Sequence, residues 1–256
     1  MTQENKKNKK NKKIDANSIL STSPYHSQKR LSMVAENYLL SIYYLQENSA
    51  KKITLTELAE YLKNAPVSEN LGSSLPSVSA MIRRLIKEDL LTSNAKDLEL
   101  STSGRRAAEF IVRRHRLAER LVVDVIGVEL KHAYEEAHLL EHAISPNVEK
   151  RLIEILNHPT TGAFGQKIPG SNYSEINEWI RLIDAIPSEE YEINSIPPED
   201  QDLLSYLVEN NIIPGTHIKV SEVSTTRGVI SIEVKDQNII FSELIASKIY
   251  VSIITK

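Results

Sequence analysis

The chain has 256 residues, a formal net charge of -3 and no cysteine. This length is sufficient for two or three small domains, and the charge excludes nucleic-acid binding through bulk basicity, so such binding would require a local patch. Without cysteine there can be no disulfide, thiolate metal site or cysteine nucleophile, so a metal would need histidine, carboxylate or other oxygen donors. We find no apolar run near the roughly 18 residues of a membrane span and no secretory signal core, and we expect a cytoplasmic protein without membrane contact.

Residues 1–30 are rich in lysine and asparagine and contain few apolar side chains. Such a segment cannot bury enough surface to become ordered. We therefore expect a disordered tail, which is either solvated or contacts DNA as a basic arm.

Residues 31–104 are expected to form a winged helix-turn-helix DNA-binding domain. Three stretches with apolar residues at helical spacing are followed by two strand-like runs, at 31–45, 54–63, 76–87, 90–92 and 98–100. Pro76 suits the first turn of the third helix. In this class of domain the third helix enters the major groove, where its first residues read bases and its basic residues meet phosphates. The candidate DNA-binding residues are Ser77, Ser79, Ala80, Arg83, Arg84 and Lys87.

The remaining chain divides into a helical part and a β part. Helices are predicted at 102–126, 131–145 and 146–156, and their short connections indicate a bundle suited to dimerisation over 105–172. We expect a linker at 173–189 and a small all-β domain, a barrel, at 190–256. The fold class is therefore mainly α with a small all-β C-terminal domain.

Two helical clusters carry metal-ligand chemistry. His138, Glu141 and His142 have i, i+3 and i+4 spacing, which places them on one helix face where they can converge on a cation. His115 and Glu119 share a face of the preceding helix, and Glu135 adds a carboxylate near His138. Without Glu135, two adjacent helices could thus offer five ligands, or the clusters could be solvated charged faces.

The sequence His138-Leu-Leu-Glu141-His142 also matches the H-x-x-E-H signature of zinc peptidases. In such an enzyme the histidines would bind zinc and Glu141 would activate water. Those enzymes need a large α/β domain and a distant third ligand, whereas this helix follows a DNA-binding pattern.

The central motifs resemble one family of regulators. The segments 113–120 (RRHRLAER), 136–145 (EAHLLEHAIS) and 164–170 (FGQKIPG) closely resemble the dimerisation domain of the diphtheria toxin repressor, iron-dependent regulator and manganese transport regulator family. The segments 36–43 and 76–79 resemble its first helix and the start of its recognition helix, and the C-terminal part resembles its SH3-like (FeoA-like) domain. The resemblance covers nearly all of the chain from Leu31.

The resemblance implies the roles of individual residues. Glu141 and His142 match primary metal ligands, His138 stands where iron-type members have cysteine and manganese-type members glutamate, and Asn37 matches the first-helix ligand. His115 and Glu119 match ligands of an ancillary site. The chain departs from the pattern because Asn37 offers only a neutral amide oxygen, for which Glu36 is a possible substitute. At the ancillary site, three positions depart from the family pattern: Tyr134, Ser195 and Pro198. The residues that could complete this site instead are Glu192, Glu199 and Asp200.

The resemblance further implies a homodimeric repressor of metal-uptake genes that binds double-stranded operator DNA when a metal is present. Without a thiolate, the ligand set suits Mn2+ or Fe2+, with Zn2+ or Co2+ as alternatives. A winged-helix protein that binds DNA without metal and a zinc hydrolase remain as alternative functions.

Overall fold

The structure is a computed structural model that describes residues 31–47, 52–63, 71–94, 97–174, 178–235 and 237–254. The predicted tail at 1–30 and most of the loop before the third helix lie outside the described residues. All that follows concerns the unit from Leu31 onward.

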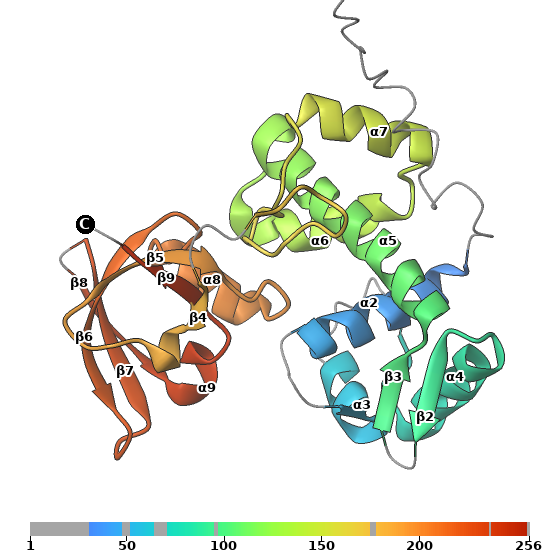
Figure 1. Cartoon of the computed structure of the whole chain (residues 1–256), viewed down its shortest axis with the longest axis horizontal. Coiled ribbons are helices and arrows are strands. Elements are labelled where there is room, and N and C mark those ends of the chain that lie inside the picture. The colour runs from blue at the N-terminus through green and yellow to red at the C-terminus, as the bar shows by residue number, and fades with distance from the viewer. Residues whose placement is uncertain are drawn as a thin grey trace, which may run out of the picture. The chain divides into compact units, whose positions relative to one another are not determined.

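The first part of this unit is a winged helix-turn-helix (Figure 1). Its elements are α2 (Met33–Glu47), β1 (Ile53–Thr54), α3 (Leu55–Lys63), α4 (Leu75–Lys87), β2 (Leu91–Asn94) and β3 (Asp97–Leu100). The strands form an antiparallel sheet in the order β1-β3-β2. The predicted order of three helices and a hairpin is confirmed, and the two-residue strand β1 is an addition.

Local signals explain where these helices begin. The backbone N–H of Thr54 donates to Glu57 Oε2 at 2.7 Å, and the N–H of Glu57 donates to Thr54 Oγ1 at 3.2 Å, which is a capping box. Ser74 caps α4, and Pro76 lies in its first turn, as the sequence predicts. The helices bury their apolar faces in a shared core that includes Leu39, Leu58 and Leu85.

The second part is helical. It contains α5 (Thr102–Arg120), a π-helical turn (Leu121–Ile126), a 3-10 turn (Leu130–His132), α6 (Ala133–Glu141) and α7 (Pro146–Ile155). The helix predicted over 102–126 is thus α-helical only as far as Arg120, and the wider π turn ends at Gly127, whose φ is 85°. The helix predicted over 131–145 is shorter than expected, because its first turn is 3-10 and α6 ends at Glu141.

The third part is a six-stranded antiparallel sheet in the order β4-β9-β5-β6-β7-β8. Its elements are β4 (Ile180–Arg181), β5 (Glu190–Ser195), α8 (Gln201–Glu209), β6 (His217–Ser224), β7 (Val229–Val234), β8 (Gln237–Ser242), α9 (Glu243–Ala246) and β9 (Tyr250–Ile253). Two short α-helices and a 3-10 turn (Leu182–Asp184) accompany the sheet. Strand β4 pairs with β9, so the sheet recruits residues from the interval 173–189 that we expected to be a linker.

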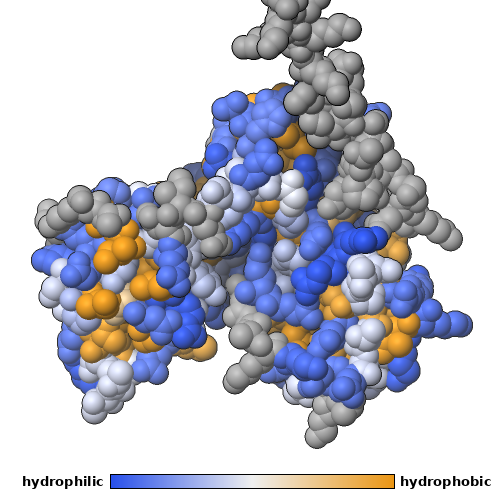
Figure 2. All heavy atoms as spheres, viewed as in Figure 1, coloured by the Kyte–Doolittle hydropathy of each residue, from blue (hydrophilic) through white to orange (hydrophobic). Residues whose placement is uncertain are grey.

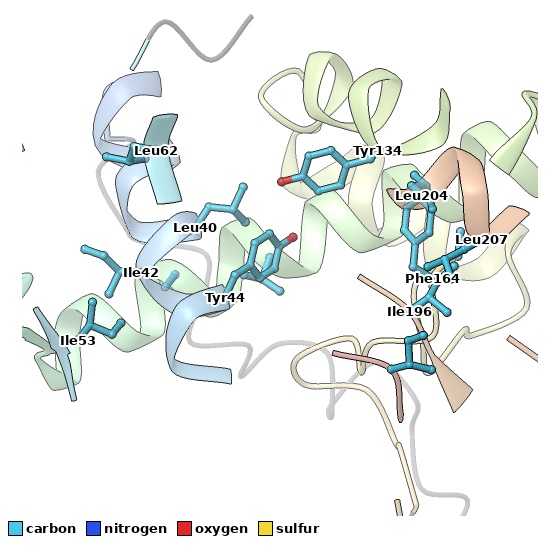
Figure 3. Close-up of a cluster of buried hydrophobic side chains, with 14 of the residues drawn as sticks. Leu40, Ile42, Tyr44, Ile53, Leu62, Tyr134, Phe164, Ile196, Leu204 and Leu207 are labelled. Carbon is cyan, nitrogen blue, oxygen red and sulfur yellow. The ribbon is translucent and has the colours of Figure 1, made fainter. Parts of the chain in front are cut away.

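The loop before this sheet contacts it closely. The Phe164 carbonyl accepts a hydrogen bond of 3.1 Å from the N–H of Ile196, and Figure 3 shows the Phe164 ring among Ile196, Leu204 and Leu207. Gly165 has a φ of +93°, and a Cβ there would lie 1.8 Å from the carbonyl oxygen of Asn194. The loop therefore requires glycine at this position.

The molecular surface is mainly hydrophilic, with hydrophobic patches on the sheet domain that Figure 2 shows. The exposed large apolar side chains of this domain are Ile186, Tyr206, Ile240, Leu244 and Ile253. Among the described residues, the helices are too short or too polar to cross a membrane.

Candidate metal centre

The centre is built from three helices. Helix α6 and its C-cap carry His138, Glu141 and His142, and α5 carries His115. The N-terminal part of α2, in the DNA-binding domain, lies against them and contributes Glu36 and Asn37. The i, i+3 and i+4 spacing predicted this convergence on α6, and the structure shows it.

Three ligand atoms converge at the centre. Glu141 Oε1 lies 3.2 Å from His138 Nδ1 and 3.3 Å from His142 Nε2. All three atoms are buried, and none makes a hydrogen bond of acceptable geometry within the described part of the chain. Buried polar atoms are normally satisfied, so exceptions grouped at one point need an explanation. Two imidazole nitrogens and a carboxylate oxygen fit a divalent cation of the borderline-to-hard class.

Helix α2 reaches the centre through two neighbouring side chains. Glu36 Oε2 lies 2.8 Å from His142 Nδ1, and the amide nitrogen of Asn37 lies 3.5 Å from His138 Nε2. Both α2 side chains are buried. Asn37, the residue expected to join the metal centre to the DNA-binding domain, therefore lies against this centre.

His115 occupies the space between two carboxylates. Its Nδ1 lies 2.7 Å from Glu141 Oε2, and its Nε2 lies 3.2 Å from Glu119 Oε1. Burial lowers the pKa of His115, but the charges and hydrogen bonds of Glu141 and Glu119 outweigh it and raise the pKa to about 10. Burial raises the pKa of Glu141, whereas the charge and hydrogen bond of His115, together with His138, lower it to about 2. The metal-free centre thus contains a buried ion pair.

Among the described residues, the group whose ligand atoms all lie within 4.8 Å of one another is His115, His138 and Glu141, which does not include His142. Glu119 is more restricted, because its Oε2 accepts a hydrogen bond of 3.1 Å from the N–H of Ala163. The Tyr134 ring, at a family histidine position, lies 4.9 Å from the His115 ring.

A pocket beside Glu119 is lined by all three parts of the unit. It includes Ser195 and Pro198, the positions that the resemblance places at an ancillary site, and Glu199. Burial raises the pKa of Glu199. Of the three carboxylates considered to complete this site, Glu199 lines the pocket, and Glu192 and Asp200 do not.

Glu135 is exposed, and the structure does not bring it into the cluster. The exposed side chains of His132, His158 and His217 are also outside it, whereas His26 lies outside the described residues. Of the candidate ligands on α6 and its C-cap, the structure brings together His138, Glu141 and His142.

Two buried arginines were not foreseen. Arg114 is 2% exposed, lies 3.3 Å from Glu36 Oε1 and covers the Phe110 ring. Arg116 is 1% exposed and pairs with Glu47, the last residue of α2, and with the Lys167 carbonyl. Arginine is rarely buried without a partner, so the four consecutive basic residues 113–116, which cover both the inner and the outer faces of a helix, could have signalled these contacts.

The recognition helix α4 buries Val78, Ile82 and Leu85 and turns its other face to solvent. Arg83 donates to Ser79 Oγ at 2.8 Å, and Arg84 pairs with Glu88. Of the six predicted DNA-binding residues, Ser79 is half-buried, and the exposed ones are Ser77, Ala80, Arg83, Arg84 and Lys87. Contact with DNA stays a prediction for each of them.

The helical domain also exposes apolar side chains. They lie on the π turn, α6 and α7, outside a small core of Ala118, Ala137, Ile144 and Leu152, and comprise Val125, Ile126, Leu139, Val148 and Ile155. Several exposed apolar residues on one domain are typical of an association surface.

The geometry does not favour the hydrolase interpretation. In an H-x-x-E-H peptidase the glutamate stays outside the metal shell and activates water. Here Glu141 Oε1 lies between the two histidines and Oε2 is held by His115, so both oxygens are engaged.

The winged helix, the helical domain with its buried cluster and the sheet domain define a metal-dependent transcriptional regulator. A family model described as the metal binding and dimerisation domain of iron dependent repressors matches residues 101–170, and the FeoA domain model matches 180–253. The iron-dependent repressor IdeR of Mycobacterium leprae is 34% identical over 218 residues, which cover 80% of this chain and 90% of that protein. The diphtheria toxin repressor of Corynebacterium efficiens is 33% identical over 204 residues, covering 75% of this chain and 84% of that protein.

Solved structures agree with this assignment. A manganese-dependent transcriptional repressor in complex with manganese has a TM-score of 0.74 and 27% identity, covering 86% of this chain and all of that one. ScaR with bound Zn2+ has a TM-score of 0.72 and 29% identity over 86% of this chain and 99% of that one. The chain therefore belongs to the family of metal-dependent transcriptional repressors that contains IdeR and the diphtheria toxin repressor.

Proposed function

We propose that this protein binds operator DNA as a homodimer and represses metal-uptake genes when a divalent metal, Mn2+ or Fe2+, occupies the centre of His138, Glu141 and His142. The observation that carries this proposal is the convergence of two imidazole nitrogens and a carboxylate oxygen without other hydrogen-bond partners. Relatives named as iron-dependent and manganese-dependent repressors support it.

Each part of the chain has a role in this scheme. We assign residues 31–104 to DNA binding, 105–172 to metal binding and dimerisation, and 190–256 with strand β4 to the sheet domain. A bound cation would supply the positive charge that holds the ligand cluster together beside α2. With α2 held, two recognition helices in a dimer keep the spacing of successive major grooves. A metal-free protein samples other orientations, so its fraction of binding-competent molecules falls.

The same proposal covers the remaining properties. The protein acts in the cytoplasm, where operator DNA is found, and it is not an enzyme. Mn2+ and Fe2+ are favoured over softer metals because the ligand set contains no sulfur, while Zn2+ and Co2+ remain chemically competent. Glu119 and Glu199, with His115, are the residues that would hold a second, ancillary ion.

The test is a gel-shift assay on the DNA upstream of the protein's own gene, with Mn2+, Fe2+ or Zn2+ and with chelator. We expect retardation that needs metal and that His142→Ala abolishes, while the exposed-site control His132→Ala behaves as wild type. Retardation that persists in chelator would instead establish metal-independent DNA binding. Peptidase activity that Glu141→Gln removes would establish the hydrolase.

A further inference from the structure

Glu36 contacts the centre without being placed among the ligand atoms. It lies in the first turn of α2, and its side chain is 5% exposed. One oxygen, Oε2, lies 2.8 Å from His142 Nδ1, and the other, Oε1, lies 3.3 Å from Arg114 Nη2. The carboxylate therefore bridges a candidate metal ligand and a buried guanidinium.

The nitrogen that Glu36 contacts determines what it can do. A carboxylate accepts hydrogen bonds, so when the lone pair of His142 Nε2 binds a metal, Glu36 accepts the proton on Nδ1. Nε2 is the atom that faces Glu141 Oε1 at 3.3 Å. In metal sites, the hydrogen bond made by one ring nitrogen of histidine fixes the tautomer and orientation of the other.

Arg114 explains why a carboxylate is stable in this position. Its side chain is 2% exposed and covers the Phe110 ring at 4.7 Å. A buried carboxylate is costly unless it is paired, and Arg114 supplies the opposite charge while His142 supplies a hydrogen bond. Glu36 is thereby held in place from the dimerisation domain on both sides, because Arg114 lies on α5 and His142 is the C-cap of α6.

These contacts join two domains through one side chain. Glu36 belongs to the first helix of the DNA-binding domain, and 106 positions separate it from His142 in the sequence. Any change in the orientation of the His142 ring alters the position that α2 can occupy. By linkage, a fixed α2 also favours the ring orientation that binds metal.

We propose that Glu36 is a positioning residue that connects metal binding to α2 through His142 and Arg114, and that it is not itself a metal ligand. This inference rests on the proposed function and specifies how the metal signal reaches the DNA-binding domain. The link between metal binding and α2 is then the hydrogen bond between Glu36 and His142, which lies outside the ligand set and acts in addition to any contact that Asn37 makes.

The test compares full-length wild type with Glu36→Ala, Glu36→Gln and the exposed-site control Glu135→Ala. Co2+ titrations followed by visible absorption measure the metal affinity and the ligand-field bands. Gel shifts at saturating Mn2+ measure whether the metal-bound protein binds DNA. We expect Glu36→Ala to weaken Co2+ binding about 10- to 100-fold with unchanged band positions, and to lose DNA retardation even at saturating metal. Glu36→Gln, which keeps an acceptor oxygen for Nδ1, should lie within about tenfold of wild type in Co2+ affinity with the same bands.

Three outcomes would overturn the inference. Bands that shift in both Glu36 variants would make Glu36 a ligand, and a folded Glu36→Ala variant with wild-type Co2+ affinity and DNA binding would remove its role. If Glu36→Ala does not fold, nitrogen-15 NMR of wild type saturated with Zn2+ decides, since a proton on Nε2 of His142 and the metal on Nδ1 would contradict the positioning geometry. Failure of wild type itself to bind Co2+ would instead contradict the proposed function.

Discussion

Nδ1 of His115 lies 2.7 Å from Oε2 of Glu141, and both side chains are completely buried. This contact occupies one oxygen of the carboxylate and leaves the other between His138 and His142. The residue predicted as an ancillary ligand therefore also fixes the central carboxylate of the primary cluster.

His115→Ala should destabilise the metal-free protein, because it leaves the carboxylate of Glu141 buried without its charged partner. Breaking a buried pair in this way typically costs about 3–5 kcal/mol. Urea unfolding in chelator measures the loss of unfolding free energy. The control His132→Ala, at an exposed histidine of the 3-10 turn before α6, should leave the unfolding free energy almost unchanged. Equal unfolding free energies for His115→Ala and wild type would show that the buried pair contributes nothing.

Glu47→Gln should weaken the junction between α2 and α5 without affecting the metal centre. Arg116 is almost fully buried, but Glu47 is 30% exposed, so we expect a loss of about 1–3 kcal/mol rather than the full cost of a buried pair. The matched control is Glu99→Gln, which breaks the exposed pair with Lys52 and should lower the free energy of unfolding less than Glu47→Gln does. Metal affinity should equal that of wild type, and a large decrease would place this pair within the metal centre.

Gly165→Ala should be among the most destabilising substitutions in the chain. The left-handed backbone costs an alanine about 1–2 kcal/mol, and its Cβ would also overlap the Asn194 carbonyl. Gly215→Ala is the control, since its φ is +84° and no atom lies within 4 Å of an added Cβ. Thermal unfolding should separate the two variants, and similar melting temperatures would contradict the close approach of this loop to β5.

Leu139→Glu should separate the dimer while leaving the metal ligands intact. Leu139 is 60% exposed on α6, whereas the neighbouring His138, the proposed ligand, is buried. Light scattering should report a monomer, and Co2+ titration should report an affinity near that of wild type. Leu244→Glu, at an exposed leucine of the sheet domain, should remain dimeric. A dimeric Leu139→Glu protein would place the association surface elsewhere.

Local patterns in the sequence predicted the three-helix order of the DNA-binding domain and the ligand face of α6, since capping residues and i, i+3, i+4 spacing act within one helix. They could not show that Glu36 would meet His142, because contacts between distant segments depend on tertiary packing. Arg114 and Arg116 were missed because burial of arginine depends on partners that spacing alone does not reveal. Helix α8 was not predicted, because we expected only strands in this domain. Its sequence did carry a local signal, with Asp200 as its cap and apolar residues at helical spacing over 203–208.

The resemblance described above places His138 where iron-type members have a cysteine, and the chain contains no cysteine at all. A thiolate ligand can be oxidised to sulfenic and sulfinic acids, which abolish its capacity to bind metal. Imidazole and carboxylate groups do not enter that series of reactions. Peroxide therefore cannot inactivate this centre through thiol oxidation, the route that is open to a thiolate ligand.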